Sequence, residues 1–300
     1  MTEAQYRAWY QKNTSDLQGK TVAITGSTGG LGRALCEHLA ALGASLILVD
    51  RNAARSEALR NTLQKAHPSI SVSCIGADME QMGSVIAAAE QLKRLPIDLL
   101  ILNAGAYAIP RHACDTGYDN VFQINFISPY CLVRELLPTL RARHGRVVAV
   151  GSIAHNYSKS DPLDVDFATR KKASSVYGNA KRYLTFSLLR LFEKETEATL
   201  AVTHPGITFT GITAHYPKLI FALIKHPMKV LFMKPKKAAL SILRGAFEPT
   251  PSLQWIGPRF FRVWGLPSKQ PLRTAKPDEI DRIEQTAKEI YEKIQKTTIL

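Results

Sequence analysis

Two side chains near the middle of the chain, a tyrosine and a lysine, have the types and the spacing that acid–base chemistry could use. Tyr177 and Lys181 lie four residues apart in the stretch VYGNAK, residues 176–181. If that stretch is helical, both side chains project from the same face, one turn apart. A phenol has a usual pKa of about 10, and a nearby positive charge lowers it toward the range where acid–base catalysis works. The pair is a candidate catalytic site, but chance also places such pairs on many solvated helices.

Short apolar runs that alternate with helical patterns surround this pair. Near-continuous apolar strands between helices indicate a parallel sheet that is covered on both faces. We therefore expect an α/β fold, with a single Rossmann-type, doubly wound parallel sheet and helices on both faces. The predicted strands are 21–25, 45–50, 71–77, 97–103, 145–152 and 198–206, and the helices between and after them are 31–42, 53–66, 81–93, 118–142, 174–195 and 278–296.

The alternation and the absence of a linker predict one domain over residues 1–300. Residues 1–18 are polar and precede the first strand, so we expect an N-terminal extension. Residues 207–272 depart from the alternation and are rich in proline, aromatic and basic residues. We expect this region to form a substrate lid and C-terminal elaboration. In the helix predicted at 278–296, one face is apolar.

A glycine cluster joins the first predicted strand to the first helix. The stretch TGSTGGLG, residues 25–32, spaces Gly26, Gly30 and Gly32 as G-x-x-x-G-x-G. Glycines let the backbone turn sharply and approach a pyrophosphate, whose charge then sits at a helix N-terminus. The cluster lies after a strand and before a helix, so it predicts a dinucleotide site.

Asp50 ends the second predicted strand, 24 residues after Gly26. A carboxylate at this place can accept hydrogen bonds from ribose hydroxyls and would repel a 2′-phosphate, which favours NAD over NADP. Asp50 could instead cap the helix that follows. Arg51 leaves NADP open, because an arginine beside that ribose can bind the 2′-phosphate. Asp78, after the third strand, and the stretch LNAG, residues 102–105, occupy places that could contact the rest of such a cofactor, although each could equally be an ordinary turn.

Composition and charge exclude several classes of protein. The 300 residues carry 39 Lys and Arg against 25 Asp and Glu, a formal charge of +14. There is no zinc-finger spacing and no RNP-like motif, so we expect no nucleic-acid partner. The histidines and the four cysteines show no metal-ligand spacing, so we expect no metal site. No secretory signal and no apolar run of about 18 residues is present, so we expect a cytoplasmic protein.

Taken in order, these motifs resemble the short-chain dehydrogenase/reductase family, over about residues 19–211. The resemblance rests on TGSTGGLG (25–32), Asp78, LNAG (102–105), Asn125 in FQINFISPY, Ser152 in VVAVGS, YGNAK (177–181) and HPGITFT (204–210). Within the family, the stretches SIAH and AKEIYEKI look like the retinol dehydrogenase-like members.

The resemblance implies a hydride-transfer enzyme with a catalytic tetrad. Tyr177 would be the general acid/base, and Lys181 would lower the pKa of Tyr177 and hold the ribose of the nicotinamide. Ser152 would hydrogen-bond the substrate oxygen, and Asn125 would sustain a water-linked proton path to Lys181. The residues expected to contact the cofactor are Gly26, Ser27, Gly30, Leu31, Gly32, Asp50, Arg51, Asp78, Met79, Asn103, Gly105, Tyr177, Lys181, Pro205, Gly206 and Thr210.

One spacing departs from the common family pattern. Ser152 and Tyr177 are 25 residues apart, and the segment between them, HNYSKSDPLDVDFATRKKAS, is polar and rich in turn formers. In the family the separation is often about a dozen residues. We expect the extra segment to loop out at the rim of the site without moving Ser152.

Two functional classes fit the sequence. The first is an NAD(P)-dependent oxidoreductase that interconverts an alcohol and a carbonyl. The second is a catalytically silent dinucleotide-binding regulator or scaffold on the same fold, since fold does not fix activity. Degenerate members of the family usually lose the tyrosine or the lysine, and this chain keeps both, which favours the enzyme. The apolar character of the region after Thr210 indicates a hydrophobic substrate such as a retinoid, a steroid or a long-chain compound.

The same region could also meet a membrane. No Asp or Glu occurs between Glu197 and Glu248, while lysines alternate with apolar and aromatic residues over 218–244. Such a helix can lie on an anionic bilayer. Alternatively, the apolar residues line the pocket and the lysines are solvated or lie at an interface between copies of the chain in a homo-oligomer.

Overall fold

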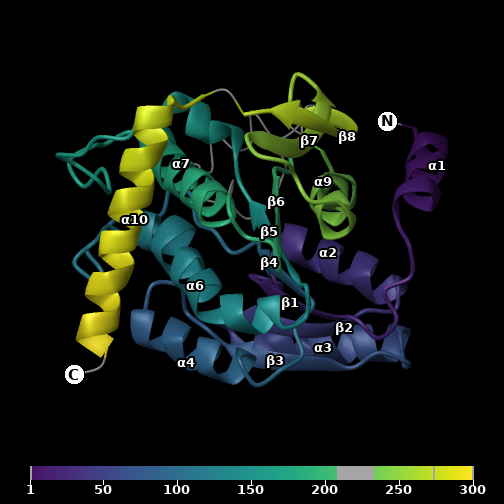
Figure 1. Ribbon diagram of the computed structural model, residues 1–300. Helices are drawn as coiled ribbons and strands as arrows, with labels where there is room; N and C mark the ends of the chain where they lie inside the picture. The colour runs from purple at the N-terminus through teal and green to yellow at the C-terminus, as the bar shows by residue number, and fades with distance from the viewer. Residues whose placement is uncertain (1, 208–232, 273, 299–300) are drawn as a thin grey trace, which may run out of the picture.

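The computed structural model describes residues 2–207, 233–272 and 274–298. All described strands that pair in ladders belong to one eight-stranded sheet, in the order β3-β2-β1-β4-β5-β6-β7-β8 (Figure 1). The strands are β1 (Thr21–Thr25), β2 (Ser45–Asp50), β3 (Val72–Gly76), β4 (Leu99–Leu102), β5 (Arg146–Val150), β6 (Thr199–Thr203), β7 (Gln254–Phe260) and β8 (Trp264–Pro271).

Helices connect the strands and flank the sheet. They are α1 (Glu3–Asn13), α2 (Gly30–Ala41), α3 (Ala53–Ala66), α4 (Met82–Leu92), α5 (Asn120–Phe122), α6 (Ser128–Arg141), α7 (Ala173–Leu191), α9 (Pro235–Phe247) and α10 (Pro277–Thr298). A π-helical turn, η1 (Gln123–Ile127), joins α5 to α6, and a 3-10 turn, η2 (Ile153–Tyr157), follows β5.

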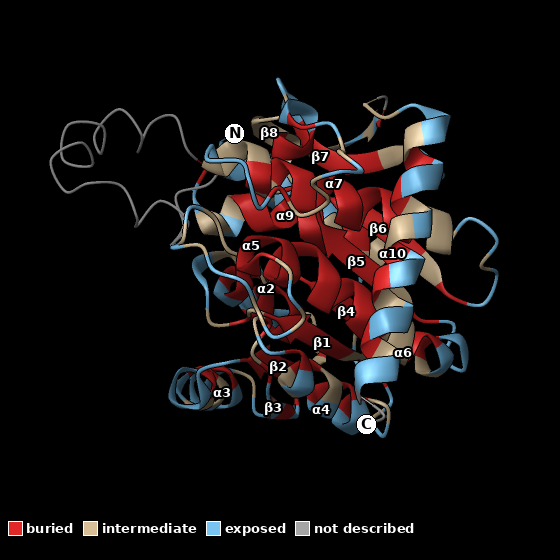
Figure 2. Ribbon diagram, turned by 90° about the vertical axis from the view of Figure 1, so that its left-hand side faces the viewer, coloured by how far each residue is buried: buried red, intermediate tan, exposed pale blue. Residues whose placement is uncertain are grey.

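The sheet is covered on both faces, as the sequence analysis predicts. Within β1, Val22 and Ile24 pack with α1, α2, α3 and α9, whereas Ala23, between them, packs with α4, α6, α7 and α10 on the opposite face. This alternation follows from the two-residue period of a strand. Burial of both faces explains why the strands are almost continuously apolar (Figure 2).

The six predicted strands and the predicted helices are confirmed, with bounds that shift by a few residues at most. The strand order reverses between β1 and β4, because the chain first adds β2 and β3 on one side and then crosses to β4 on the other. In open parallel sheets, ligands bind at this switch point, outside the carboxyl ends of the strands.

The C-terminal third contributes more of the sheet than the sequence analysis predicted. The whole of 207–272 was expected to be lid and elaboration, yet α9 packs on the sheet, β7 continues it in parallel and β8 returns antiparallel to β7. These strands contain Pro258, Pro267 and Pro271, and prolines argue against a strand in a sequence pattern. At the other end of the chain, residues 1–18 contain the unpredicted helix α1, which a capping box at Thr2 begins and buried Trp9 holds to the body.

The predicted amphipathic helix is α10. Ile283 and Ala287 are fully buried, and Ile280, Ile290 and Ile294 are nearly so. The helix lies beside α7 and α6 with its outer face exposed (Figure 2). Arg182, on α7, is buried and donates hydrogen bonds to both carboxylate oxygens of Glu279, at 2.7 and 2.6 Å. This ion pair fixes the start of α10 against the helix that carries Tyr177 and Lys181.

Candidate active site

A cavity of about 1030 Å³ lies at the carboxyl ends of the parallel strands, at the switch point. Most of the residues predicted to contact a cofactor or to catalyse line it, although they come from loops far apart in the sequence. These lining residues are Gly26, Gly30, Leu31, Gly32, Asp50, Arg51, Asp78, Met79, Asn103, Gly105, Ser152, Tyr177, Lys181, Pro205 and Gly206. Ser27 and Asn125 lie behind the wall, fully buried, and Thr210 falls outside the described residues.

The glycine loop is closed on itself in a way that only glycine allows. Gly26 has φ +68°, and a Cβ atom there would lie 2.8 Å from the Cα of Ala104. A Cβ atom on Gly32 would lie 2.3 Å from the carbonyl oxygen of Gly26. The Asn103 side chain donates to the carbonyls of Thr25 and Gly26, at 3.1 and 2.9 Å. The loop therefore holds one compact shape beside the strand ends.

The helix that follows the loop begins without a side-chain cap. Gly29 is the N-cap of α2, no side chain caps it, and the first turn contains no acidic residue. The first N–H groups of a helix have no partner within the helix, and the helix dipole favours an anion there. These features form the type of cradle that binds a pyrophosphate.

Asp50 is turned into the protein, where it holds the glycine loop. Its Oδ2 accepts hydrogen bonds from the hydroxyls of Ser27 and Ser56, and its Oδ1 accepts from the N–H and the hydroxyl of Thr28. A carboxylate has about four lone-pair positions, so these donors fill it. The sequence analysis favoured NAD because this carboxylate would accept ribose hydroxyls, and the structure gives its oxygens other partners. Arg51 and Arg55 line the same end of the cavity.

Tyr177 and Lys181 project from one face of α7, as their spacing predicts. The Lys181 side chain is 3% exposed, and its Nζ donates to the carbonyl oxygen of Val150 at 3.0 Å. Tyr177 is half-buried, lines the cavity and has its ring 5.3 Å from the Tyr107 ring in an edge-on arrangement. Ser152, which begins η2, forms a hydrogen bond with Tyr177.

Burial dominates the pKa values of Tyr177 and Lys181. It raises the pKa of Tyr177 to about 12, a hydrogen bond with Ser152 offsets only part of that rise, and Tyr107 raises it further. Burial also lowers the pKa of Lys181 to about 8. The sequence analysis expected Lys181 to lower the pKa of Tyr177. That expectation stays a prediction, because burial is the largest influence on both groups and removal from water disfavours the charged form of each.

Asn125 sits in the π-helical turn η1. Its amide donates to the carbonyls of Val121 and Ala106, both at 2.8 Å. A Cβ atom on Gly105 would lie 2.8 Å from Asn125 Oδ1 and 3.6 Å from Lys181 Nζ. Asn125 thus meets Gly105 and Lys181, which line the cavity, from behind the cavity wall. Such π-helical turns occur often at functional sites.

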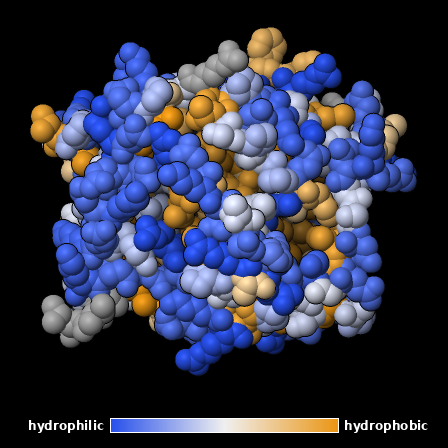
Figure 3. Space-filling view, viewed as in Figure 1, coloured by the Kyte–Doolittle hydropathy of each residue, from blue (hydrophilic) through white to orange (hydrophobic). Residues whose placement is uncertain are grey.

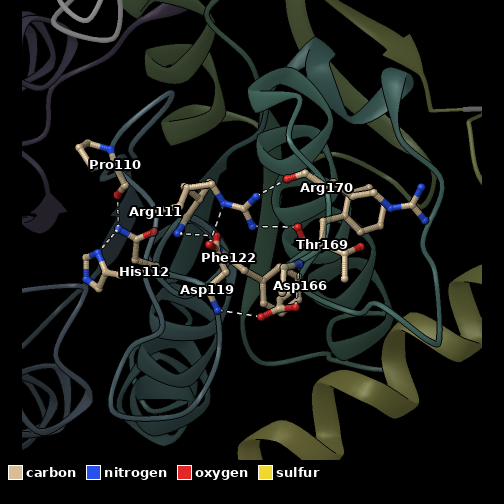
Figure 4. A network of polar contacts seen from close by, with 12 residues as sticks. Pro110, Arg111, His112, Asp119, Phe122, Asp166, Thr169 and Arg170 are labelled. Carbon is tan, nitrogen blue, oxygen red and sulfur yellow. Dashed lines mark hydrogen bonds and ion pairs between the residues drawn. The ribbon is translucent and has the colours of Figure 1, made fainter.

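The extra segment between Ser152 and Tyr177 is tied to the loop that follows β4 (Figure 4). The Arg111 guanidinium donates to Asp119 Oδ2 and to the Phe167 carbonyl, both at 2.8 Å, and also to the Arg170 carbonyl. Asp119 caps α5, which leads into the turn that holds Asn125. Phe167 is buried in a cluster with Val121 and Val176, and Tyr177 packs against this cluster. The segment is therefore part of the site's wall, closer than the rim position that the sequence analysis expected.

Sequence reasoning missed three lining side chains near Tyr177. Tyr107 and Ile109 follow the LNAG stretch, and Tyr157 ends η2. Their apolar and aromatic types beside the motifs were the available signal. It also missed Arg111, for which the sequence offers no signal, because its partners lie up to 59 residues away.

Comparison with known proteins agrees with this geometry. The model of the family described as short chain dehydrogenase matches residues 20–163. Human retinol dehydrogenase 14 is 31% identical over 266 residues, which cover 82% of this chain and 78% of that protein. The chain belongs to the short-chain dehydrogenase/reductase family.

Other relatives of this short-chain dehydrogenase extend the agreement over most of the chain. Mouse polyprenol dehydrogenase is 26% identical over 275 residues, covering 88% of this chain and 81% of that protein. The crystal structure of an uncharacterized protein from Mycobacterium paratuberculosis superposes with a TM-score of 0.72 at 23% identity, covering 95% of this chain and 96% of that one. The last likeness shows the shared fold. The dehydrogenase is an NAD(P)-dependent oxidoreductase that acts on CH–OH groups.

Proposed function

We propose that this dehydrogenase interconverts a hydrophobic alcohol and its carbonyl, with Tyr177 as the general acid/base. One observation carries the proposal: Tyr177 and Ser152 form a hydrogen bond at the cavity wall, with buried Lys181 on the same helix face. Two hydroxyls that face one cavity can hold a substrate oxygen and exchange a proton with it.

The residues at the switch point fit an NAD(P) cofactor. Gly26 and Gly32 leave no room for side chains, and the uncapped start of α2 suits the pyrophosphate. When bound, the oxidised cofactor supplies a hydride acceptor whose ring carries a positive charge. Tyr177, with its raised pKa, keeps its proton when no further positive charge is near. Lys181 holds its cation beside that phenol, and Asn125 and Gly105 fix the space behind it.

We infer that NADP is the preferred form of the cofactor, in place of the NAD that the sequence favoured. Asp50 lines the cavity, but Ser27, Thr28 and Ser56 donate hydrogen bonds to its Oδ1 and Oδ2, so both oxygens already have partners within the protein. Arg51 and Arg55 offer two exposed guanidiniums at that end, and a guanidinium binds a phosphate well. Titration of the protein with NADPH and with NADH tests the inference, and tighter binding of NADH would contradict it.

The substrate end of the cavity supports an apolar substrate. Tyr107, Ile109, Ile153 and Tyr157 line it around Tyr177, whereas the carboxylates of Asp50 and Asp78 line the far end. Apolar linings with a few placed polar groups are typical of sites for hydrophobic small molecules. Two of the relatives bear the names of apolar alcohols, retinol and polyprenol.

A turnover assay tests the function as a whole. Purified protein is mixed with NADP or NAD and a panel of retinoids, steroids, long-chain alcohols and polar sugars, and formation of the reduced cofactor is followed by absorbance. We expect turnover of apolar members of the panel, with the reverse reaction on their carbonyls. Tight cofactor binding without turnover of any member, in either direction, would favour the silent regulator.

The membrane hypothesis for 218–244 rests mainly on residues outside those described. In its described part, Met233 is buried and the apolar side chains of α9 pack into the core. Among the described residues, no helix combines the length and the apolar character that crossing a membrane requires.

A further inference from the structure

Two phenylalanines at the tip of the β7–β8 hairpin are among the most exposed apolar side chains of the described chain. Phe260 is 60% exposed and Phe261 is 86% exposed. Arg259 precedes them and Arg262 follows them, so the tip reads Arg-Phe-Phe-Arg. Figure 3 shows apolar side chains at the upper edge of the molecule, where Figure 1 places this hairpin. Adjacent exposed aromatic residues mark a surface that meets a partner.

The backbone holds these side chains outward at a conformational cost. Phe261 has φ +49° and Arg262 has φ +60°, and the Val263 N–H donates to the Phe260 carbonyl at 2.9 Å. A hairpin turn with two successive positive φ angles prefers Asn-Gly, because other side chains are strained there. The turn instead carries Phe-Arg, which stability alone does not explain. Residues held in such conformations concentrate at functional sites.

The charge around the tip is of one sign. Between Glu248 and Asp278 the sequence contains no Asp or Glu but five basic residues. Lys269 pairs with Glu248 at 3.2 Å, whereas no ion pair joins Arg259 or Arg262 to a carboxylate within the described part of the chain. The Arg262 guanidinium lies over the ring of buried Trp255, 5.9 Å from its centre, whereas Arg259 is exposed. Exposed aromatic side chains next to basic residues that have no carboxylate partner are the composition that settles at the interface of an anionic bilayer.

The hairpin packs on the mouth of the cavity. A Cβ atom on Gly206 would lie 2.5 Å from the Val263 carbonyl oxygen and 2.9 Å from Pro258 Cγ. Ile207, next in the chain, lines the cavity, is 37% exposed and accepts a hydrogen bond from the Met233 N–H at 3.1 Å. Lys234, which follows Met233, is exposed and adds another cation at this mouth. A surface that meets the tip therefore lies beside the entrance of the cavity.

We propose that the Arg259–Arg262 tip is a docking element for an anionic lipid bilayer, with Phe260 and Phe261 inserted at the interface. Docking places the cavity mouth at the membrane, so an apolar substrate enters without crossing water. The docking itself stands on the hairpin alone and does not depend on turnover; only its link to the substrate rests on the proposed function.

Vesicle co-sedimentation of the full-length protein tests the proposal. The vesicles are phosphatidylcholine alone, or phosphatidylcholine with about one third phosphatidylglycerol, a fraction that gives a clearly negative surface. We expect wild-type protein to pellet with the anionic vesicles and to be released by salt. Phe260→Ser/Phe261→Ser should weaken the apparent affinity about ten-fold or more, as loss of two buried aromatic side chains requires. Arg259→Glu/Arg262→Glu should remove the preference for anionic vesicles.

Leu163→Ser is the matched control, because Leu163 is 98% exposed and lies away from the hairpin in the segment before α7. It should bind as wild type does. A second measurement uses Phe261→Trp and Leu163→Trp, whose fluorescence is compared with and without brominated lipid. Quenching of the first and not of the second supports insertion of the tip.

Three outcomes would overturn the proposal: no binding of wild-type protein to anionic vesicles, wild-type binding by the Phe260→Ser/Phe261→Ser variant, or equal quenching of both tryptophan variants. Conversion of a wild-type oligomer to monomers by Phe260→Ser/Phe261→Ser, without vesicle binding by either protein, would assign the tip to an interface between copies of the chain. Thermal unfolding of each variant, compared with wild type, shows that the fold is retained.

Discussion

The Nζ atom of Lys181 lies 5.7 Å from the centre of the Tyr177 ring. Burial shifts the pKa of each group against its charged form, that of Lys181 to about 8 and that of Tyr177 to about 12. At neutral pH the Tyr177 phenol is uncharged whether the chain is folded or unfolded, so the cost to the folded state comes from the Lys181 ammonium, and it can be measured apart from activity.

Tyr177→Phe tests the catalytic role. The variant keeps the ring packed against Tyr107 but loses the proton that the reaction exchanges. General acid–base catalysis is worth about 10²–10⁴-fold, so kcat should fall by about that factor. Binding of NADPH, followed by its fluorescence, should stay within about three-fold of wild type, since the pyrophosphate cradle is untouched. A kcat equal to that of wild type would remove Tyr177 from the mechanism.

Lys181→Met should abolish turnover and weaken cofactor binding, yet stabilise the protein without cofactor. The buried ammonium, with its pKa lowered from 10.5 to about 8, costs the folded state roughly 3 kcal/mol at neutral pH. The variant also loses the hydrogen bond to the Val150 carbonyl, which lowers its stability by about 1–2 kcal/mol. The net gain in the free energy of unfolding is therefore on the order of 1 kcal/mol.

The sign of the pH dependence follows from the same shift. The unfolded chain binds the Lys181 proton more tightly, so the wild-type penalty is full below about pH 8 and vanishes as the pH rises toward about 10.5. Urea unfolding at several pH values should show the advantage of Lys181→Met shrinking over that window. Lys172→Met, at an exposed lysine that precedes α7, should show no such trend. A constant difference for Lys181→Met would mean that the lysine is not desolvated.

Arg51→Ala/Arg55→Ala tests the cofactor assignment. Loss of two guanidiniums from the end of the cavity should weaken NADPH binding about 10–100-fold and NADH binding much less, because only NADPH carries the 2′-phosphate. Isothermal titration of both cofactors gives the ratio. Asp50→Ala should instead lower the free energy of unfolding by about 3 kcal/mol or more, since Ser27, Thr28 and Ser56 lose a charged acceptor. If a stable Asp50→Ala protein bound NADPH more tightly than wild type, the Asp50 carboxylate would be repelling the 2′-phosphate, as the sequence analysis argued.

Arg111→Ala should loosen the wall of the substrate site. The side chain holds Asp119 and the carbonyls of Phe167 and Arg170, so its loss frees the segment before α7. We expect faster tryptic cleavage near Lys171, and a higher KM with a smaller change in kcat. Arg141→Ala is the control: it also removes an arginine, but its partner Glu195 lies elsewhere, at 2.6 Å. Equal cleavage rates of the two variants would show that Arg111 does not hold this segment in place.

Glu279→Gln should cost stability at neutral pH and lose its effect in acid. Burial alone would raise the pKa of Glu279, but hydrogen bonds from Arg182 and Ser160 and the charge of Arg182 outweigh it and lower the pKa to about 2. The stability that the ionised carboxylate provides is therefore full above about pH 4.5 and is lost as the pH falls toward 2. Loss of a buried partner of Arg182 is worth about 3 kcal/mol. Unfolding of wild type and variant at neutral and acid pH measures the difference; an undiminished gap in acid would contradict it.

The order of strands and helices could be read from the sequence because burial on both faces leaves continuous apolar runs such as SLILVD, residues 45–50. The same logic missed β7 and β8, whose prolines and glycines disguise them. The sequence also placed Tyr177, Ser152 and Lys181 at one cavity. The sequence could not predict the directions in which side chains point. Asp50 has the position of a ribose ligand, yet neighbouring hydroxyls turn its carboxylate inward, and Arg111 acts through carbonyls that no motif records.

The π-helical turn η1 inserts one extra residue into an otherwise continuous helical path from Asn120 to Arg141. Each residue of an α-helix advances the chain by about 100°, so the turn offsets everything before it from everything after it. The two ends of this helical path can therefore pack in two different places. Val121 packs with Phe167 beside the site, while Leu132 and Leu136 pack in the large core cluster that covers one face of the sheet. Asn125 lies within the π-helical turn itself. A homologue that shortened this helix by one residue would keep every motif in its sequence and still lose the alignment of Asn125 with Lys181.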